Sequence, residues 1–226
     1  ERMRFLLPDS YLDFFLTHGI LEIEAPLPLE TLAHLKEACL KNLKENLSGK
    51  PIEIASRNEL WKAGRNQWSK AADLKKNLQK MQLGNLCHSL FQQKPIRLAY
   101  SQLITPSTKD PELFTAPRTL QEISALSPLL GGALLILEAP EIAEPFKTPN
   151  LLQAKLGHLF FISKDYSLPL PQLLSNVTHL YLLLAFAPQK MRYCLEIKDP
   201  LAHELKKQGL VFGDTPSEEI CPYLYR

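Results

Sequence analysis

The sequence predicts an α+β chain in which N-terminal helices buttress a core built from β-strands. Residues 1–95 contain amphipathic helical patterns, whereas residues 96–226 contain short apolar runs bounded by turns or prolines. A chain of 226 residues with 45% hydrophobic residues is long enough to bury a sizeable core. We therefore expect a single domain over residues 1–226, mostly helical to residue 95 and mostly β from residue 96.

The first half opens with a short helix, a strand and a long helix. Residues 9–19 predict a helix that ends at a glycine, with Asp9 or Ser10 as its N-cap. Residues 20–25 alternate apolar and acidic side chains, as a half-buried strand does. Residues 28–47 predict a long amphipathic helix, because apolar residues recur at helical spacing: Leu32, Leu35, Cys39 and Leu43.

After residue 50, the sequence pattern changes from a polar segment to a helix and then to a series of strands. Residues 51–70 are polar and contain both tryptophans, and residues 71–91 predict another helix. Short strands dominate from there, and they are expected at residues 96–104, 133–139, 158–163, 179–186 and 192–197.

Composition excludes several classes of protein. A net charge of +2 gives no reason to expect nucleic acid or an acidic membrane as the main partner. The four cysteines form no C-x-x-C pair, so we expect reduced thiols and a cytoplasmic location. No apolar run reaches 18 residues, and the longest, residues 180–187, suits a buried strand rather than a membrane span.

Residues 12–43, 121–140, 157–163 and 175–188 share a loose pattern of apolar spacing with one known family. They resemble the phytanoyl-CoA dioxygenase-like proteins, which belong to the iron(II)- and 2-oxoglutarate-dependent oxygenases. This resemblance implies a double-stranded β-helix, the jelly-roll or cupin-like fold. The leucine- and lysine-rich style is also similar to that of uncharacterised conserved bacterial proteins of chlamydiae.

The family's iron ligands are missing from the sequence. Active members hold iron with two histidines and one carboxylate, and the first pair is written H-x-D or H-x-E. No acidic residue stands two positions after any of the six histidines, which are His18, His34, His88, His158, His179 and His203. The sequence therefore assigns no catalytic or metal-binding residue, and we expect no cofactor.

The remaining family positions also depart from the pattern. The second histidine would fall near Leu168, and the arginine that pairs with 2-oxoglutarate would follow Asn176, where His179 stands nearby. Histidine lacks the two-pronged, permanent charge of arginine, and a strand histidine with a satisfied hydrogen bond is the simpler interpretation. Together with Asp165, expected at the pocket rim, they form four pocket-facing candidates: Asp165, Leu168, Asn176 and His179.

Three functions are compatible with these observations. The first is a degenerate, non-catalytic member of the oxygenase fold that binds an unknown small molecule or protein. The second is an active oxygenase that uses iron(II) and 2-oxoglutarate through atypical ligands, such as Asp165, His179 and an acidic residue near Asp110 or Glu112. The third is a nucleic-acid-binding regulator that uses lysine-rich helices and the tryptophans: Lys75, Lys76, Lys80, Trp61 and Trp68. Neighbouring acidic residues disfavour this third function, because they dilute the positive charge.

Overall fold

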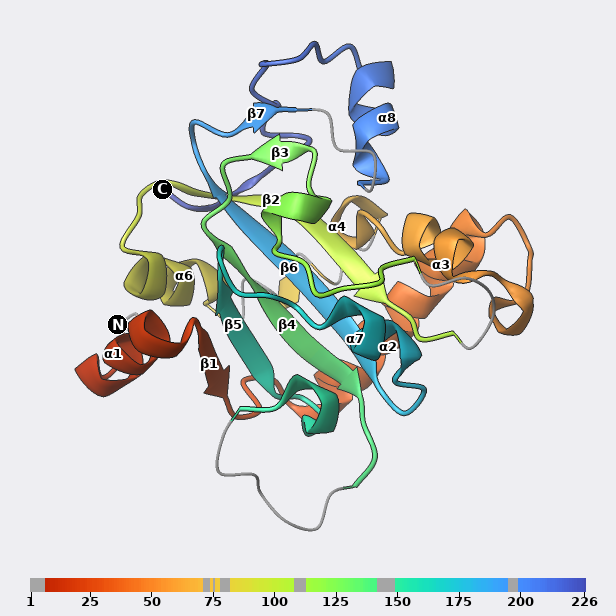
Figure 1. Ribbon diagram of the computed structural model, residues 1–226, viewed down its shortest axis with the longest axis horizontal. Helices are drawn as coiled ribbons and strands as arrows, with labels where there is room; N and C mark the ends of the chain where they lie inside the picture. The colour runs from red at the N-terminus through yellow and green to blue at the C-terminus, as the bar shows by residue number, and fades with distance from the viewer. Residues whose placement is uncertain are drawn as a thin grey trace.

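The computed structural model describes residues 7–70, 74, 76–77, 82–107, 113–141, 149–194 and 199–226. It is a mixed α/β structure with two antiparallel sheets (Figure 1). The large sheet has the order β1 (Ile20–Ile23), β5 (Leu159–Ser163), β4 (Gly131–Glu138), β6 (Leu180–Pro188), β2 (Ile96–Ile104), β8 (Tyr223–Tyr225). The small sheet pairs β3 (Leu126–Ser127) with β7 (Arg192–Tyr193).

Short helices connect and cover these strands. The α-helices are α1 (Asp9–His18), α2 (Leu29–Asn46), α3 (Arg57–Ala63), α4 (Gln67–Lys70), α6 (Leu83–Phe91), α7 (Leu170–Ser175) and α8 (Leu201–Lys207). The described part of the chain also contains the 3₁₀ turns η1 (Ile52–Ile54), η2 (Gln121–Ile123) and η3 (Leu151–Gln153). Within the described residues, no helix is long and apolar enough to cross a bilayer.

Side chains of the large sheet enter two different cores, because neighbouring residues of a strand point to opposite faces. In β4, Leu135 and Leu137 join one buried cluster, whereas Leu134 and Ile136 join the other. The first cluster also contains apolar residues of α1, α2, α3 and α6. Both faces of the central strands are therefore buried, which explains their continuous apolar sequences.

The second cluster, here called the inter-sheet core, lies between the large sheet and the layer that contains β3 and β7. Its residues from that layer come from η2, η3, α7, α8 and the loops between them. They are almost all aliphatic or aromatic: Phe114, Leu120, Ile123, Leu126, Leu151, Leu168, Leu170, Leu173, Met191, Tyr193, Leu201 and Leu205. Any site enclosed between the sheets would have to lie among these side chains.

The periodic elements of the sequence are where we expected them, and the differences lie in the caps and connections. α1 ends at Gly19, which has a left-handed φ of 69°, but its N-cap is Pro8 rather than Asp9 or Ser10. The polar segment 51–70 contains η1, α3 and α4, and the connection after β5 contains α7. The expected helix 71–91 and strand 192–197 lie partly outside the described residues.

Candidate functional site

Leu168, at the position expected for the second iron-binding histidine, is a packing residue of the inter-sheet core. Its side chain is fully buried. Its backbone pairs with Arg118 in an isolated antiparallel bridge, with N–H···O distances of 2.9 and 3.0 Å. A leucine offers no electron pair to a metal, so this position contributes apolar contact rather than coordination.

Arg118, the bridge partner of Leu168, is a charged residue that no sequence pattern singles out. Its Nη1 lies 3.2 Å from Oε1 of Glu122, and 30% of its side chain is exposed. Hydrogen bonding to the Thr119 N–H, with a contribution from Arg118, lowers the pKa of Glu122. Among the described residues, the buried Nε of Arg118 has no hydrogen-bond partner. One guanidinium donor is therefore left over beside Leu168.

Asn176 and His179 belong to one hydrogen-bonded network at the start of β6. The Asn176 amide donates to the Tyr181 hydroxyl at 2.8 Å and to the Leu152 carbonyl at 3.0 Å. The hydroxyl of Thr178 donates to Asn176 Oδ1 at 2.9 Å, and the His179 ring stacks on Tyr181 with centroids 5.6 Å apart. This network fastens η3 and the end of α7 to the sheet.

Both ring nitrogens of His179 are already used. Nε2 lies 3.0 Å from the carbonyl of Ala154, which can only accept, so Nε2 carries the proton. Nδ1 lies 2.8 Å from the Thr178 hydroxyl, whose single proton serves either Nδ1 or Oδ1 of Asn176. Burial lowers the pKa of His179, so the neutral ring is favoured in the folded protein. The geometry is that of a satisfied structural histidine.

Asp165 lies far from this network. It is exposed in the turn that follows β5, and that end of β5 pairs with Gly131 at the start of β4. His179 precedes the residue of β6 that pairs with Glu138 at the other end of β4. The seven-residue length between these ends corresponds to roughly 20 Å at about 3.3 Å per residue. The structure therefore brings together Asn176 and His179 but not Asp165.

The donor set does not fit iron within the part of the chain that is described. There, no three His, Cys, Asp or Glu side chains gather closely enough to hold a metal ion. The inter-sheet core around Leu168 is apolar, and the His179 nitrogens are occupied. Asp110 and Glu112, the acidic loop residues considered from the sequence, lie outside the described residues.

Trp61 does not contribute to the basic aromatic surface considered from the sequence, because its side chain is buried. Trp61 is only 3% exposed and packs edge-on against Phe114, with centroids 5.1 Å apart, so it is not available to stack on a base. Lys76 is exposed, and Lys75 and Lys80 lie outside the described residues.

A second polar feature surrounds Arg65 and Asp199, which form a buried ion pair. Arg65 Nη2 and Nε lie 3.0 and 3.1 Å from Oδ1 of Asp199, and the side chains are 2% and 0% exposed. Arg65 Nη2 also donates to the Ile123 carbonyl at 2.8 Å. Asp199 accepts the N–H groups of Ala125 at 2.5 Å and Leu201 at 2.8 Å. The pair thereby links α3, η2 and the start of α8.

The guanidinium of Arg65 is not fully satisfied. Its Cζ lies 3.9 Å from the centre of the Tyr100 ring and 5.6 Å from that of Trp61. Burial raises the pKa of Tyr100, and the Arg65 charge opposes this effect. In the described part of the chain, Nη1 of Arg65 is buried and makes no hydrogen bond. A buried donor without a partner is unusual and needs a cause such as a water or a ligand.

The backbone holds Arg65 in place by a close approach to β2. Leu103 N–H donates to the Gly64 carbonyl at 2.8 Å, and Asn66 N–H donates to the Ser101 carbonyl at 2.7 Å. A Cβ at position 64 would lie 2.4 Å from the Leu103 carbonyl oxygen, so only glycine fits. α3 itself starts with a capping box in which Ser56 and Glu59 satisfy each other's backbone N–H.

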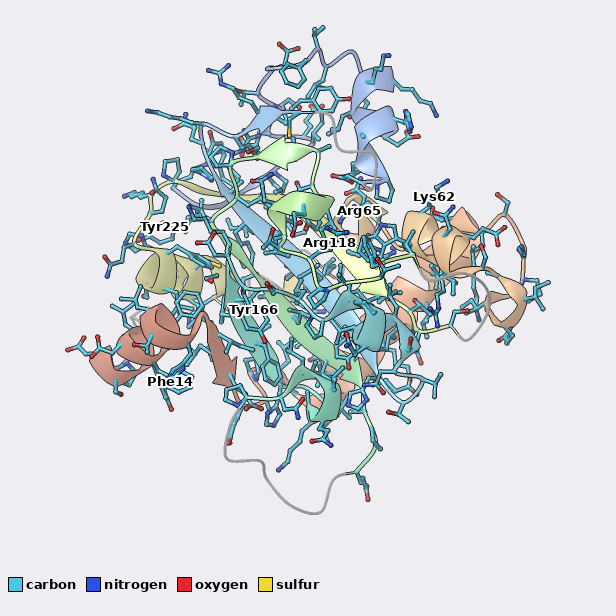
Figure 2. All side chains as sticks on the ribbon, viewed as in Figure 1. Phe14, Lys62, Arg65, Arg118, Tyr166 and Tyr225 are labelled. Carbon is cyan, nitrogen blue, oxygen red and sulfur yellow. The ribbon has the colours of Figure 1, made fainter. Side chains whose placement is uncertain are left out.

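Arg65 also lines a cavity of about 440 Å³ that opens between α3, α4 and α8. Figure 1 shows these helices on one side of the molecule, and Figure 2 labels Lys62 and Arg65 there. The lining residues are mostly polar: Asn46, Lys62, Arg65, Asn66, Ser69, Pro200, Leu201, Glu204 and Gln208. A smaller cavity of about 290 Å³ shares Asn46 and Lys62 with it.

Sequence reasoning missed this cavity for a physical reason. Its two charged anchors, Arg65 and Asp199, are 134 residues apart, and each looks like an ordinary surface residue next to a short helix. The S-x-x-E pattern at Ser56 to Glu59 could have located α3. No sequence signal reports that an arginine is buried against a distant aspartate.

Comparisons with known proteins identify the fold. No protein-family model matches the chain, and no curated protein sequence matches it significantly. The structure is similar to the non-heme α-ketoglutarate-dependent carbocyclase SnoK from nogalamycin biosynthesis, with 14% identity, 96% of each chain covered and a TM-score of 0.67. It is also similar to the α-ketoglutarate-dependent epimerase SnoN of the same biosynthesis, with 13% identity, 96% and 98% coverage and a TM-score of 0.62.

CT296 from Chlamydia trachomatis is a further solved structure that matches, with 15% identity, 83% and 99% coverage and a TM-score of 0.48. At identities this low, the likeness to SnoK and SnoN concerns the fold. The resemblance suspected from the sequence is thereby confirmed at that level. The chain has the fold of the iron- and α-ketoglutarate-dependent oxygenases.

Proposed function

We propose that this protein is a non-catalytic member of the oxygenase fold that binds a small molecule. The observation that carries the proposal is Leu168, fully buried in apolar surroundings where the resemblance expects an iron-binding histidine. Such a position stabilises the fold through burial and offers a metal nothing. A protein partner is the alternative form of the same binding role.

The contrast between the two polar regions supports a binding role outside the inter-sheet core. The side chains of His179 and Asn176 make hydrogen bonds to other groups of the protein. The cavity beside α8, by contrast, is lined by polar groups and by the incompletely satisfied Arg65. A cavity of this volume lies within the size range of small-molecule sites, and its mostly polar lining suits a polar ligand.

The proposal includes a finer description of the architecture. The two antiparallel sheets around the inter-sheet core correspond to a double-stranded β-helix, and the helices that share the other core with β4 act as its buttress. In this description, the fold serves as a rigid support for the helical surface, and its interior is filled.

Turnover of 2-oxoglutarate tests the proposal. The purified protein is loaded with iron(II) and 2-oxoglutarate without oxygen, air is admitted, and succinate is measured against a protein-free iron control. We expect no succinate above the control. Protein-dependent succinate formation that also requires iron would overturn the proposal, and its loss in His179→Gln or Asp165→Asn would assign the ligands.

A further inference from the structure

Among the described residues, Lys62 is the one charged residue lining the cavity beside α8 that has no ion-pair partner. Three charged residues line it, and two are already compensated: Arg65 by Asp199 at 3.0 Å, and Glu204 by Lys207 at 3.1 Å. Lys62 has no ion-pair partner among the described residues. An exposed lysine on the wall of a concave site attracts an anion.

The adjoining cavity leaves the same charge unbalanced. Lys50 and Glu59 line it together with Lys62, and they neutralise each other through contacts of 2.7 and 2.8 Å. The hydrogen bond from Lys50, followed by that from the Ser56 backbone, lowers the pKa of Glu59 to about 2. This carboxylate is therefore already paired and does not balance the charge of Lys62. In the part of the chain that is described, Lys62 therefore remains the charge without an ion-pair partner that both cavities share.

Hydrogen-bond donors surround the same space. The side chains of Asn66, Ser69 and Gln208 line the larger cavity together with Lys62, and the Ser69 hydroxyl already donates to the Asn66 carbonyl at 3.2 Å, which leaves its oxygen as an acceptor. Beneath them lies Arg65, whose Nη1 is buried and makes no hydrogen bond in the described structure. Pro200 and Leu201 supply a short apolar wall. A ligand with an oxyanion at one end would pair with Lys62 through that group. The remainder of the ligand would make polar contacts with the other side chains that line the cavity.

We propose that this cavity binds a small organic oxyanion, a carboxylate- or phosphate-bearing molecule, through Lys62 and the donors around it. The inference rests on the proposed function, since it names the ligand class for the binding role. A volume of about 440 Å³ accommodates a metabolite-sized molecule but not a folded partner. Of the residues that line the cavity, only Leu201 also belongs to the inter-sheet core.

Tryptophan fluorescence provides the readout for binding. The Trp61 ring lies 5.6 Å from the Arg65 guanidinium, and Trp68 belongs to α4, so both report on this part of the molecule. The protein is titrated separately with inorganic phosphate and with succinate, and with sodium chloride at matched ionic strength. We expect a saturable change with phosphate, succinate or both, and none with chloride. The stronger of the two responses identifies the chemistry.

Three variants locate the binding. Lys62→Gln removes the unbalanced charge, and Asn66→Gly removes an amide donor while keeping the left-handed backbone at φ 62°. Lys41→Gln is the matched control. It removes one positive charge, as Lys62→Gln does, but at an exposed position of α2 that does not line the cavity. Loss of one charge-assisted hydrogen bond predicts about tenfold weaker binding for Lys62→Gln and no change for Lys41→Gln.

The possible outcomes separate this inference from the proposed function. Absence of saturable binding, or equal weakening by Lys62→Gln and Lys41→Gln, would overturn the anion site and leave the proposed function standing. Iron-dependent succinate formation together with anion binding that depends on Lys62 would overturn the proposed function alone.

Discussion

The inter-sheet core and the cavity beside α8 differ in how completely their polar groups are satisfied. Around Leu168, most side chains are apolar, and His179, Asn176 and Tyr181 bond to one another and to η3, while the buried Nε of Arg118 has no hydrogen-bond partner among the described residues. Around Arg65, a buried ion pair coexists with a guanidinium nitrogen that makes no hydrogen bond in the described structure. A folded protein tolerates such a group where it has a use.

This difference favours the cavity beside α8 over the inter-sheet core as the place of a functional site. A buried polar group without a hydrogen-bond partner calls for a cause, such as a catalytic role, a water or a bound ion. Here, Leu168 and its neighbours in the inter-sheet core are buried apolar side chains, and the buried Arg65 nitrogen that makes no hydrogen bond in the described structure belongs to a residue lining the cavity between α3, α4 and α8. Four substitutions test that contrast, and they follow in order of decreasing expected effect.

Replacing Asp199 by Asn is expected to have the largest effect. The variant keeps the shape of the side chain but leaves the Arg65 charge buried without its partner, which lowers the free energy of unfolding by about 3 to 5 kcal/mol. Urea denaturation measures this change. Glu204→Gln, an exposed carboxylate on α8, is the matched control and is expected to stay within about 0.5 kcal/mol of wild type. Equal effects would refute the buried pair as a structural anchor.

Leu168→Ala tests whether the interior is packed. A fully buried leucine that leaves a cavity lowers the free energy of unfolding by about 2 to 5 kcal/mol. Val177→Ala, at a side chain that is 63% exposed, is expected to change it by less than about 0.5 kcal/mol. If Leu168→Ala is as mild as Val177→Ala in urea denaturation, the interior is open at this point and the contrast fails.

Gly64→Ala tests the close approach that positions Arg65. The backbone φ of −77° suits alanine, so the effect comes only from the Cβ, which would lie 2.4 Å from the Leu103 carbonyl oxygen. We expect a loss of about 1 to 3 kcal/mol in the free energy of unfolding. Gly209→Ala has no atom within 4 Å of the added Cβ, and its left-handed φ of 90° predicts only about 1 kcal/mol. A smaller loss for Gly64→Ala than for Gly209→Ala would contradict the crowding.

His179→Gln is expected to have the smallest effect, visible in the pH dependence of stability. Burial lowers the folded-state pKa of His179 below the ordinary 6.5, so the unfolded chain binds the proton more readily. The stability contribution is present above pH 6.5 and is lost as the pH falls through the lower folded pKa. Urea midpoints between pH 7.5 and pH 5 should therefore fall less in His179→Gln than in wild type. An unchanged slope would show that His179 does not titrate in this way.

Much of the fold could be predicted from the sequence, because periodicity and apolar runs report burial directly. α1, β1 and α2 follow from alternating or helical spacing, β4, β5 and β6 follow from apolar runs, and β2 follows from a short, mostly apolar segment bounded by prolines. α7 escaped notice because prolines in SLPLPQ indicate a loop, although Pro171 is tolerated in the first turn of a helix.

The candidate sites were only partly predictable. The absence of the H-x-D or H-x-E pattern and the placing of Leu168 at a ligand position were available from the sequence, and Asn176 and His179 do share one network. The neutral, doubly bonded state of His179 depends on Ala154, 25 residues away, and the burial of Arg65 depends on Asp199. Contacts at such separations follow from tertiary structure and leave no local pattern.

The most direct test of the central claim is the thermal unfolding midpoint with manganese(II) and 2-oxoglutarate, measured without oxygen. A ligand that binds only the folded state raises the midpoint when its concentration is well above its dissociation constant. We predict no shift that requires both metal and 2-oxoglutarate at millimolar concentrations. A shift with 2-oxoglutarate alone that disappears in Lys62→Gln would belong to the cavity beside α8. A shift that requires both components and survives Lys62→Gln would contradict the account and place a working metal site within this fold.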